Sequence, residues 1–325
     1  MEFTIDENSA NQRIDKVIKR TLPDAPISFI YKMFRNKDVK VNEKRVKIDY
    51  ITKLGDRVDV YLKPALLEQF KKEKALRPVD PHMEILYEDE NILIVNKPKG
   101  LLVHGDEGEK RITLQNIFLN YLSAKGEYDP NNTTNFVPGP AHRLDRNTSG
   151  ICIFGKNLAS LQALLELFRT KEEIEKSYLA LLYGNVPSEG HIDFPLFKDS
   201  EKGLVHVGSL ERGAKEAHTV YKVEKRYGNK FALVRAKLVT GRTHQLRVHF
   251  QAIRCPIVGD AKYGDFKINK EFEERFGLKS QFLHAAYFRF GNVTNYLSYM
   301  SNREFTAPLP EKEQKILLAL DEKRR

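Results

Sequence analysis

The sequence predicts an α+β protein. Its larger part, residues 76–325, is expected to form a mixed, largely antiparallel sheet, and residues 1–75 a small α/β unit before it. Beyond residue 81, short strand candidates follow one another as sequential hairpins without regular strand–helix alternation, which favours an antiparallel sheet. The chain has 325 residues, 41% of them apolar, enough for two domains with a sizeable core. The charged stretch 63–80 shows no sustained strand pattern and predicts a linker.

Two helices and a hairpin are expected in the small unit. The stretch NQRIDKVIKRTL predicts an amphipathic helix whose apolar face carries Ile14, Val17, Ile18 and Leu22. The stretch FIYKMFRN predicts a second helix, with Ser28 as its N-cap. The following DVKVNEKRVKI predicts a β-hairpin that turns at Asn42 and Glu43, and LGDRVDVYL predicts a closing strand.

Basic side chains gather on the second helix and the hairpin, where only Asp38 and Glu43 oppose them. Such a cluster predicts a face that binds RNA phosphates. The alternative is an ordinary solvated basic face. The residues concerned are Lys32, Arg35, Lys37, Lys40, Lys44, Arg45 and Lys47.

The larger part alternates between short strand and helix candidates. The predicted strands are MEILYED, NILIVNK, ICIFGK, SYLALLYG, HTVYKVEKRY, FALVRAKLV and QLRVHF. The predicted helices are TLQNIFLNYL, NLASLQALLELFRT and the C-terminal EKEQKILLALDEK.

Composition limits the classes of protein to consider. The net charge of +10 and the pI near 9.3 suggest a polyanionic partner, or simply a lysine-rich surface. Cys152 and Cys255 are expected to be buried free thiols, because two cysteines cannot build a disulfide framework. The start MEFTIDENSA does not resemble a signal peptide, and no apolar run reaches membrane-spanning length. We therefore expect a cytoplasmic, monomeric protein without membrane association.

Motifs for cofactors and metals are missing from the sequence. It contains no phosphate-binding GxxxxGK[ST] loop, no GxGxxG after a strand, no HExxH pair and no GxSxG elbow. We therefore expect no cofactor. The histidines are not accompanied by carboxylates or thiolates at metal-ligand spacing, so no metal site is predicted at His142, His244, His249 and His284.

The motif HRLDRNTSG, residues 142–150, places the carboxylate of Asp145 between Arg143 and Arg146, just before the apolar strand ICIF. Two interpretations fit this pattern. An exposed loop held by salt bridges has this composition, and so has an active site that keeps an acid beside a polyanion. The motif by itself leaves both open.

The two parts of the chain resemble two known families. Residues 11–62 resemble the S4 domain, an RNA-binding module, through the R-I-D helix, the second helix, VKVNEKRVK and LGDRVDV. Residues 81–290 resemble the RluA-type pseudouridine synthases, which isomerise uridine in structured RNA. The motifs that carry this second resemblance are NKPKGLLVHG, HRLDRNTSGICIFGK, KSYLALLYG, TGRTHQLRVHF, PIVGDAKYGD and FLHAA, in this order. The S4 block and VHG are most similar to the RluC branch, which implies large-subunit (23S) ribosomal RNA as the substrate.

The resemblance also implies roles for single residues. Asp145 matches the catalytic aspartate of the family, and Arg242 matches the basic residue that pairs with it. Tyr178 matches the tyrosine that stacks on the base and can remove the C5 proton, and a neighbouring Arg242 would favour its phenolate. Further implied residues are Arg143, which can fill the gap left by a flipped base, and Leu283 as an apolar wall. Alternatively, Arg242 and Arg247 are RNA-binding residues that contact only phosphates.

The implied reaction breaks the N1–C1′ bond of uridine, turns the uracil and rejoins it through C5. It exchanges neither electrons nor phosphate, and one carboxylate suffices where glycosidases use two. Asn147 stands where the family usually has Asp, which leaves the catalytic position intact. Two alternatives remain: the same chemistry on transfer RNA or other ribosomal uridines, and a non-catalytic S4-type RNA-binding protein. The intact Asp145, Tyr178 and Arg242 argue against the second alternative.

Overall fold

The computed structural model describes residues 1–70, 76–105, 111–130, 136–199 and 203–322. The chain forms two compact units. The first unit comprises Met1–His82, Gln115–Gly139 and Gly155–Gln162, and the second comprises Met83–Leu114, Pro140–Phe154 and Ala163–Arg325. The chain therefore passes between the units more than once, and the domain boundary at residues 75/76 stays a prediction.

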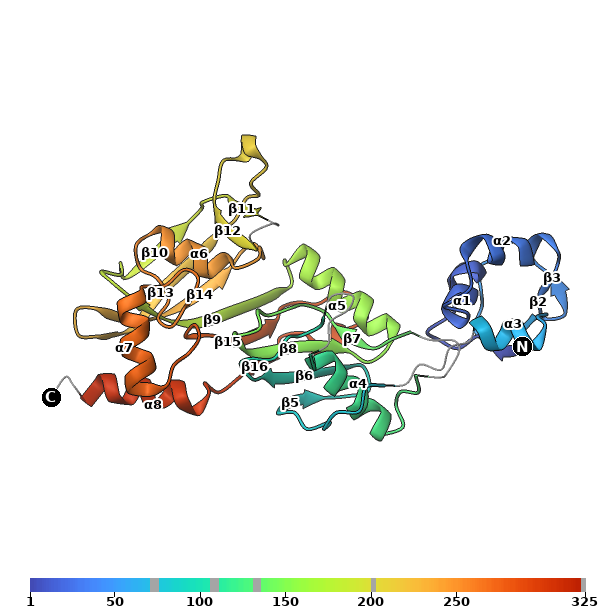
Figure 1. Ribbon diagram of the computed structural model, residues 1–325, viewed down its shortest axis with the longest axis horizontal. Helices are drawn as coiled ribbons and strands as arrows, with labels where there is room; N and C mark the ends of the chain where they lie inside the picture. Colours follow the sequence, from blue (N-terminus) through green and yellow to red (C-terminus); the bar gives the residue numbers. More distant parts are fainter. Residues whose placement is uncertain (71–75, 106–110, 131–135, 200–202, 323–325) are drawn as a thin grey trace. The chain divides into compact units, whose positions relative to one another are not determined.

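The N-terminal part of the first unit is a small antiparallel sheet with helices (Figure 1). The sheet has the strand order β1-β4-β2-β3, with the bounds β1 (Glu2–Thr4), β2 (Val39–Val41), β3 (Lys44–Arg45) and β4 (Arg57–Val60). The helices of this part are α1 (Ile14–Thr21), α2 (Ile27–Arg35) and α3 (Pro64–Phe70). The apolar faces predicted for the first two helices supply its core, which includes Ile14, Val17, Ile18, Leu22, Ile30 and Met33.

Local details of this unit differ in part from the expectation. Asn42 and Glu43 have φ angles of 48° and 66°, as a two-residue turn between twisted strands requires, so the predicted hairpin turn is confirmed. The prediction that Ser28 caps α2 is wrong, because Pro26 occupies the N-cap and fixes the backbone at the helix entry. The first part of the expected linker is helical, and Phe70 of α3 packs against Phe29 at 4.9 Å between ring centroids. Residues 71–75 of that linker lie outside the described residues.

The second unit is built on a ten-stranded sheet, whose main path has the order β10-β13-β14-β9-β15-β8-β6-β5 (Figure 1). The prediction of a mixed, largely antiparallel sheet is confirmed, because β15 pairs in parallel with β8 and antiparallel with β9. The strands are β5 (Ile85–Glu88), β6 (Ile92–Lys97), β7 (Gly139–Pro140), β8 (Ser149–Gly155), β9 (Ile174–Tyr183), β10 (Glu189–Ile192), β13 (Thr219–Tyr227), β14 (Phe231–Leu238), β15 (Leu283–Phe290) and β16 (Glu304–Thr306).

A separate hairpin and further helices complete the described chain. The hairpin consists of β11 (Leu196–Asp199) and β12 (Leu204–Val207). The helices are α4 (Leu114–Ala124), α5 (Leu158–Thr170), α6 (Gln245–Ala252), α7 (Phe266–Phe276) and α8 (Glu311–Glu322), with short 3-10 turns η1 (Leu210–Arg212) and η2 (Ser298–Met300). Within the described ranges, no helix is both long and apolar enough to span a membrane.

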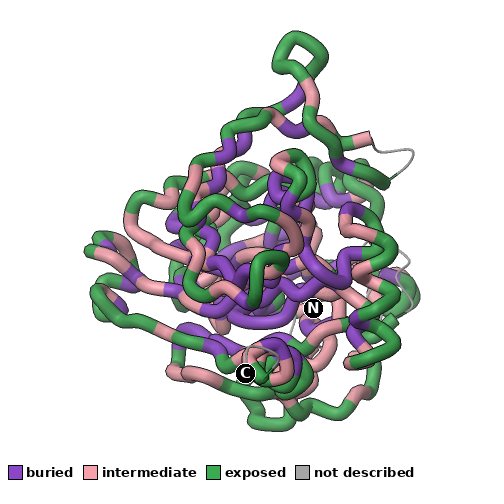
Figure 2. The backbone as a smooth tube through the Cα atoms, turned by 90° about the vertical axis from the view of Figure 1, so that its left-hand side faces the viewer, coloured by how far each residue is buried: buried purple, intermediate pink, exposed green. Residues whose placement is uncertain are grey.

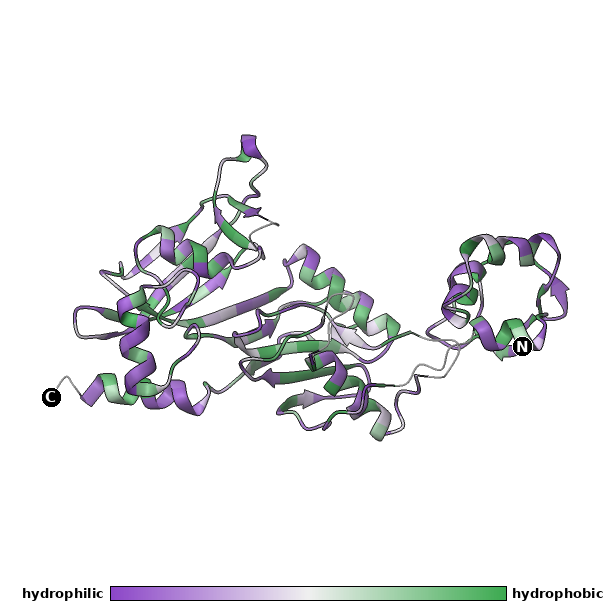
Figure 3. Ribbon diagram, viewed as in Figure 1, coloured by the Kyte–Doolittle hydropathy of each residue, from purple (hydrophilic) through white to green (hydrophobic). Residues whose placement is uncertain are grey.

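The middle of the large sheet is buried. Every residue of β8 is buried, and the strand is mainly hydrophobic (Figure 3). Figure 2 colours the buried residues of the chain purple. Cys152 lies in this strand, and both it and Cys255 are buried free thiols, as predicted. Gly150 allows the parallel contact with β15, because a Cβ at this position would lie 2.2 Å from the carbonyl oxygen of Ala285. This contact fixes the start of β8, which begins within the HRLDRNTSG motif.

The stretch QLRVHF forms helix α6, so the prediction of a strand there is wrong. Residues 245–250 are all buried, and the polar members owe their burial to hydrogen bonds. Gln245 donates to the carbonyl of His218, and Nδ1 and Nε2 of His249 lie 2.9 and 3.0 Å from Thr219 Oγ1 and the Phe194 carbonyl. Because residues 245–250 are all buried, the stretch lacks the exposed polar face that usually identifies a helix. Its polar and apolar residues alternate, and this alternation is typical of a strand.

Candidate active site

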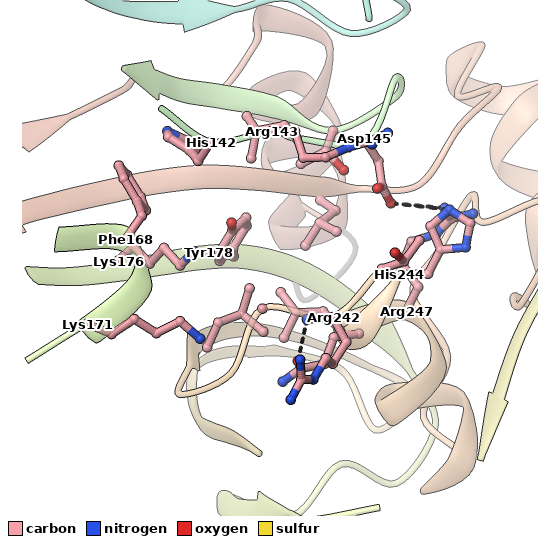
Figure 4. Close-up of a pocket in the computed structure, with 18 residues that line it drawn as sticks. His142, Arg143, Asp145, Phe168, Lys171, Lys176, Tyr178, Arg242, His244 and Arg247 are labelled. Carbon is pink, nitrogen blue, oxygen red and sulfur yellow. Dashed lines mark hydrogen bonds and ion pairs between the residues drawn. The ribbon is translucent and has the colours of Figure 1, made fainter. Parts of the chain in front are cut away.

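A cavity of about 340 Å³ opens in the second unit (Figure 4). Its walls come from the HRLD segment, the end of α5, strand β9 and the segment around the start of α6. Six of the predicted site residues line it together, although they are widely separated in the sequence: Arg143, Asp145, Tyr178, Arg242, Arg247 and Leu283.

Asp145 is held from a distant part of the chain, and neither flanking arginine pairs with it in the described structure. Its Oδ2 accepts a hydrogen bond from Nη1 of Arg247 at 3.1 Å. Arg146 instead donates to the carbonyl of Gly100. The Asp145 side chain is 26% exposed, so the carboxylate stays accessible from the cavity. The interpretation of this motif as an exposed loop held by salt bridges is therefore wrong.

Arg247 is fixed by a second carboxylate. Its Nε and Nη2 donate to the two oxygens of Asp260, at 2.7 and 2.9 Å, and the Asp260 side chain is fully buried. Burial alone would lower the pKa of Arg247, but the hydrogen bonds and charge of Asp260, together with Asp145, raise it. The guanidinium is thus permanently charged, and its remaining nitrogen is aimed at Asp145.

The predicted partner of Asp145 has to be corrected. Arg242 lies in the same cavity, but it is exposed and its Nε donates to the carbonyl of Glu216 at 2.9 Å. Arg247, predicted as a phosphate contact, is the buried arginine that pairs with Asp145. The reason is the helix at 245–252, which turns Arg247 inward and leaves Arg242 in the preceding loop.

Tyr178 stands on β9 between two small neighbours, Ala236 of β14 and Ala285 of β15. Its side chain is buried, and within the described residues its hydroxyl has no hydrogen-bond partner. Burial, followed by the negative charge of Asp145, raises the pKa of Tyr178 above the ordinary value. The prediction that Arg242 favours a phenolate at Tyr178 is therefore wrong, and the phenol is neutral at neutral pH.

The remaining predicted pocket residues differ in exposure. Leu283 of β15 is 4% exposed and contributes an apolar wall. Arg143 is exposed, and the described residues contain no ion pair for it. Its guanidinium is thus available at the rim of the cavity, two residues before Asp145.

The sequence analysis missed several residues that line the same cavity. Lys176 is two residues before Tyr178 on β9, and alternate residues of a strand share one face, so this position could have been found. Lys171 and Phe168 at the end of α5 are also present. His244 lies 3.8 Å from Asp145 through Nε2, and its Nδ1 is 2.9 Å from the hydroxyl of Tyr263. No sequence signal indicates these last contacts.

A buried lysine supports the loop that carries Asp145. Lys97 is fully buried, and its ammonium donates to the carbonyls of Pro98, Leu101 and Arg146 at 2.8, 2.8 and 3.2 Å. Burial lowers the pKa of Lys97 to about 8. The three bonds connect the turn after β6 to the residue that follows Asp145.

The basic residues predicted to bind RNA lie together on the first unit. All are exposed except Lys40, which is half-buried with its ammonium 5.0 Å from the ring centroid of Tyr61. Within the described residues none of these side chains takes part in an ion pair: Lys32, Arg35, Lys37, Lys40, Lys44, Arg45 and Lys47.

The histidines considered as metal ligands have other partners. His284 contacts Ser149 and the carbonyl of Ala307, and Nε2 of His142 accepts from the amide of Ile153. Across the described ranges, no group of three or more His, Cys, Asp or Glu side chains could hold a metal ion.

The chain is similar to known proteins of one family. Residues 91–252 match the family model of RNA pseudouridylate synthase. A ribosomal large subunit pseudouridine synthase C from Vibrio parahaemolyticus is 35% identical, covering 97% of this chain and 95% of that protein. The protein of the same description from Escherichia coli K12 is 37% identical, covering 89% and 87%.

Solved structures lead to the same family. Human RNA pseudouridylate synthase domain containing 4 matches 73% of this chain and 93% of its own, with a TM-score of 0.59 and 26% identity. The human domain containing 1 protein gives a TM-score of 0.54 at 25% identity, covering 75% and 97%. The resemblance to RluA-type pseudouridine synthases is confirmed: the chain belongs to the RNA pseudouridylate synthase family and is an RNA pseudouridine synthase.

Proposed function

We propose that this enzyme converts uridines of large-subunit ribosomal RNA into pseudouridine, with Asp145 as its catalytic carboxylate. The catalytic part of this proposal rests on the Asp145–Arg247 pair. Asp145 is the one acidic residue among the described residues that line the cavity, and Arg247 holds it there. The substrate rests on relatives of 35–37% identity, whose descriptions name the large ribosomal subunit. The basic net charge of +10 fits an RNA partner.

A single carboxylate fits an internal transfer of the base. In the reaction the N1–C1′ bond breaks, the C5–C1′ bond forms, N1 gains a proton and C5 loses one. Arg247 donates a hydrogen bond to Asp145 and holds its carboxylate in place, where it can act as nucleophile or stabilise charge on the sugar. Hydrolysis would need a second carboxylate to activate water, and the described cavity lining supplies none.

Tyr178 provides a flat wall for the uracil and a neutral hydroxyl. Because the pKa of Tyr178 is raised, the hydroxyl can accept the C5 proton only while it passes its own proton to solvent water. The hydroxyl has no competing partner in the described structure, which leaves it available to the substrate.

RNA recognition requires that the target nucleotide leaves its stack, because an A-form helix hides its bases. The exposed Arg143 at the cavity rim can occupy the vacated position. We assign residues 1–75 to an S4 domain whose seven basic residues bind phosphates, which adds affinity without reading sequence. We also propose that the enzyme acts in the cytoplasm as a monomer.

Tritium release tests this function. The enzyme is incubated with [5-³H]uridine-labelled transcripts of large-subunit ribosomal RNA, small-subunit ribosomal RNA and transfer RNA. Release from the large-subunit transcript alone is expected. Release from transfer RNA alone would show that the enzyme performs the same reaction on a different substrate. The absence of release from all three RNAs would favour a non-catalytic binding protein.

A further inference from the structure

The cavity has a cationic end that the reaction so far leaves unused. Lys171 and Lys176 extend into it from the side away from Asp145, with Tyr178 between (Figure 4). Arg242, the arginine that does not pair with Asp145, lines the same cavity. Positive side chains thus gather where the described structure provides no counter-charge.

These cations retain most of their hydrogen-bond donors. Lys171 uses one to reach the carbonyl of Val239 at 3.1 Å, and Arg242 uses Nε to reach Glu216. Lys176 makes no hydrogen bond within the described residues, and its ammonium lies 5.5 Å from the ring centroid of Phe168. Several N–H groups therefore remain free for a ligand.

Neighbouring carboxylates are directed elsewhere. Glu173 accepts a hydrogen bond from Thr294 at 2.8 Å, and Glu175 pairs with Lys237 at 3.5 Å. In the part of the chain that the structure describes, neither Lys171 nor Lys176 forms an ion pair. The cluster is therefore complementary to an anion from outside the protein.

The cations also affect one another. Burial, followed by the charge of Arg242, lowers the pKa of Lys171. Burial, followed by the charge of Lys171, lowers the pKa of Lys176 to about 8. A bound anion would relieve both the repulsion and the desolvation.

Lys171 is held in an unfavourable backbone conformation. Its φ is 63°, in the left-handed region that glycine adopts more readily, directly after the last residue of α5. The backbone and the bond to Val239 together hold its ammonium beside the cavity.

We propose that Lys171, Lys176 and Arg242 form a phosphate subsite for the phosphodiester group next to the target uridine. The inference rests on the proposed function, because it needs C1′ of the uridine at Asp145 and the uracil at Tyr178. In a nucleotide, the ribose ring separates the phosphate from C1′. With C1′ at Asp145, the phosphate therefore lies away from the two carboxylates that share Arg247, those of Asp145 and Asp260. The cavity of about 340 Å³ fits one nucleotide, whose phosphate then meets the cationic end.

The first test changes the RNA and leaves the enzyme intact. RNA fragments that the wild-type enzyme modifies are synthesised with one uncharged methylphosphonate linkage, on the 5′ or on the 3′ side of the target uridine. One of these linkages should raise KM by about tenfold or more, the size of one charge-assisted hydrogen bond. An unchanged KM with both linkages would overturn the subsite.

The second test changes the enzyme. Lys176→Met should raise KM on natural RNA to a similar extent, with no further increase on RNA that carries the sensitive neutral linkage. Lys176→Arg should restore KM. Lys237→Met, at a lysine paired with Glu175 and not among the cavity residues, is the matched control and should leave KM unchanged. A fall in kcat at constant KM, or additive effects of variant and linkage, would contradict a phosphate contact.

Failure of the proposed substrate gives a different result from failure of the subsite. If the wild-type enzyme modifies no large-subunit fragment, the proposed function fails. The subsite is then measured as the affinity for a short uridine oligonucleotide with and without the neutral linkage. Equal affinities in that comparison overturn the subsite as well.

Discussion

At the scale of residues, the site depends on how one guanidinium is shared. Asp260 accepts hydrogen bonds from two nitrogens of Arg247 and fixes the Arg247 side chain. Asp145 accepts a hydrogen bond from the third nitrogen. Only Asp145 of these two carboxylates reaches the cavity. The arrangement orients the accessible carboxylate before the substrate arrives, which is the preorganisation that catalysis requires.

Removal of the Tyr178 hydroxyl should slow the last proton transfer. Tyr178→Phe keeps the ring, so RNA affinity should persist while kcat falls by about a hundredfold, typical of the removal of an acid–base group. The kinetic isotope effect with 5-deuterouridine should increase, because departure of the C5 proton becomes rate-limiting. If the variant turns over like the parent, the tyrosine acts only as a stacking surface and water takes the proton.

His142 should make folding stability depend on pH. Burial, followed by the charge of Lys176, lowers the pKa of His142 to about 3, and Nε2 accepts from the Ile153 amide. As pH falls below about 6.5, the unfolded chain binds a proton that the folded protein refuses, so stability decreases toward pH 3. The Tm of His142→Gln should therefore fall less than that of the parent between pH 7.5 and 5. Equal decreases in both proteins would show that His142 is protonated in the folded state.

At the scale of elements, the basic face on α2 and the β2–β3 hairpin should determine the salt dependence of binding. Lys44→Gln, Arg45→Gln and Lys47→Gln together should reduce the slope of log Kd against log salt by about 0.7 to 0.9 for each phosphate that is no longer neutralised. The matched control changes Lys270, Lys279 and Lys315 to Gln, each of which pairs with a glutamate. An unchanged slope in the first variant would show that this face does not touch RNA.

The elements also show which features sequence can predict. Periodicity and short apolar runs predicted α1 and the strands β5, β6, β8, β9, β13 and β14, but they missed other strands of the sheet, among them the central β15. The Asn42–Glu43 turn was also predicted, and both residues have the left-handed backbone that such a turn needs. The pattern failed at α6, where hydrogen-bonded polar residues are buried on every side. The pairing of Asp145 with Arg242, which the family resemblance implied, is likewise replaced by Arg247 of this helix. Long-range partners such as Asp260, and the cavity position of Lys171, depend on tertiary packing that no local pattern records.

At the scale of the whole molecule, the work is divided between two surfaces. In the proposed function, the positive charge on the seven basic residues of the first unit supplies affinity for any RNA. The cavity of the second unit holds the groups that face a single nucleotide. Specificity for particular uridines must then come from the cavity and from the fold of the RNA, because phosphate contacts carry no sequence information.

The central claim, that Asp145 is the catalytic carboxylate, is tested most directly by Asp145→Asn. The substitution keeps the shape and removes the charge. We predict that tritium release from [5-³H]uridine-labelled large-subunit RNA falls at least about a thousandfold, as for the removal of a catalytic nucleophile, while Tm and RNA affinity stay close to those of the parent. Activity within about tenfold of the parent would contradict the claim, because another residue would then perform the reaction.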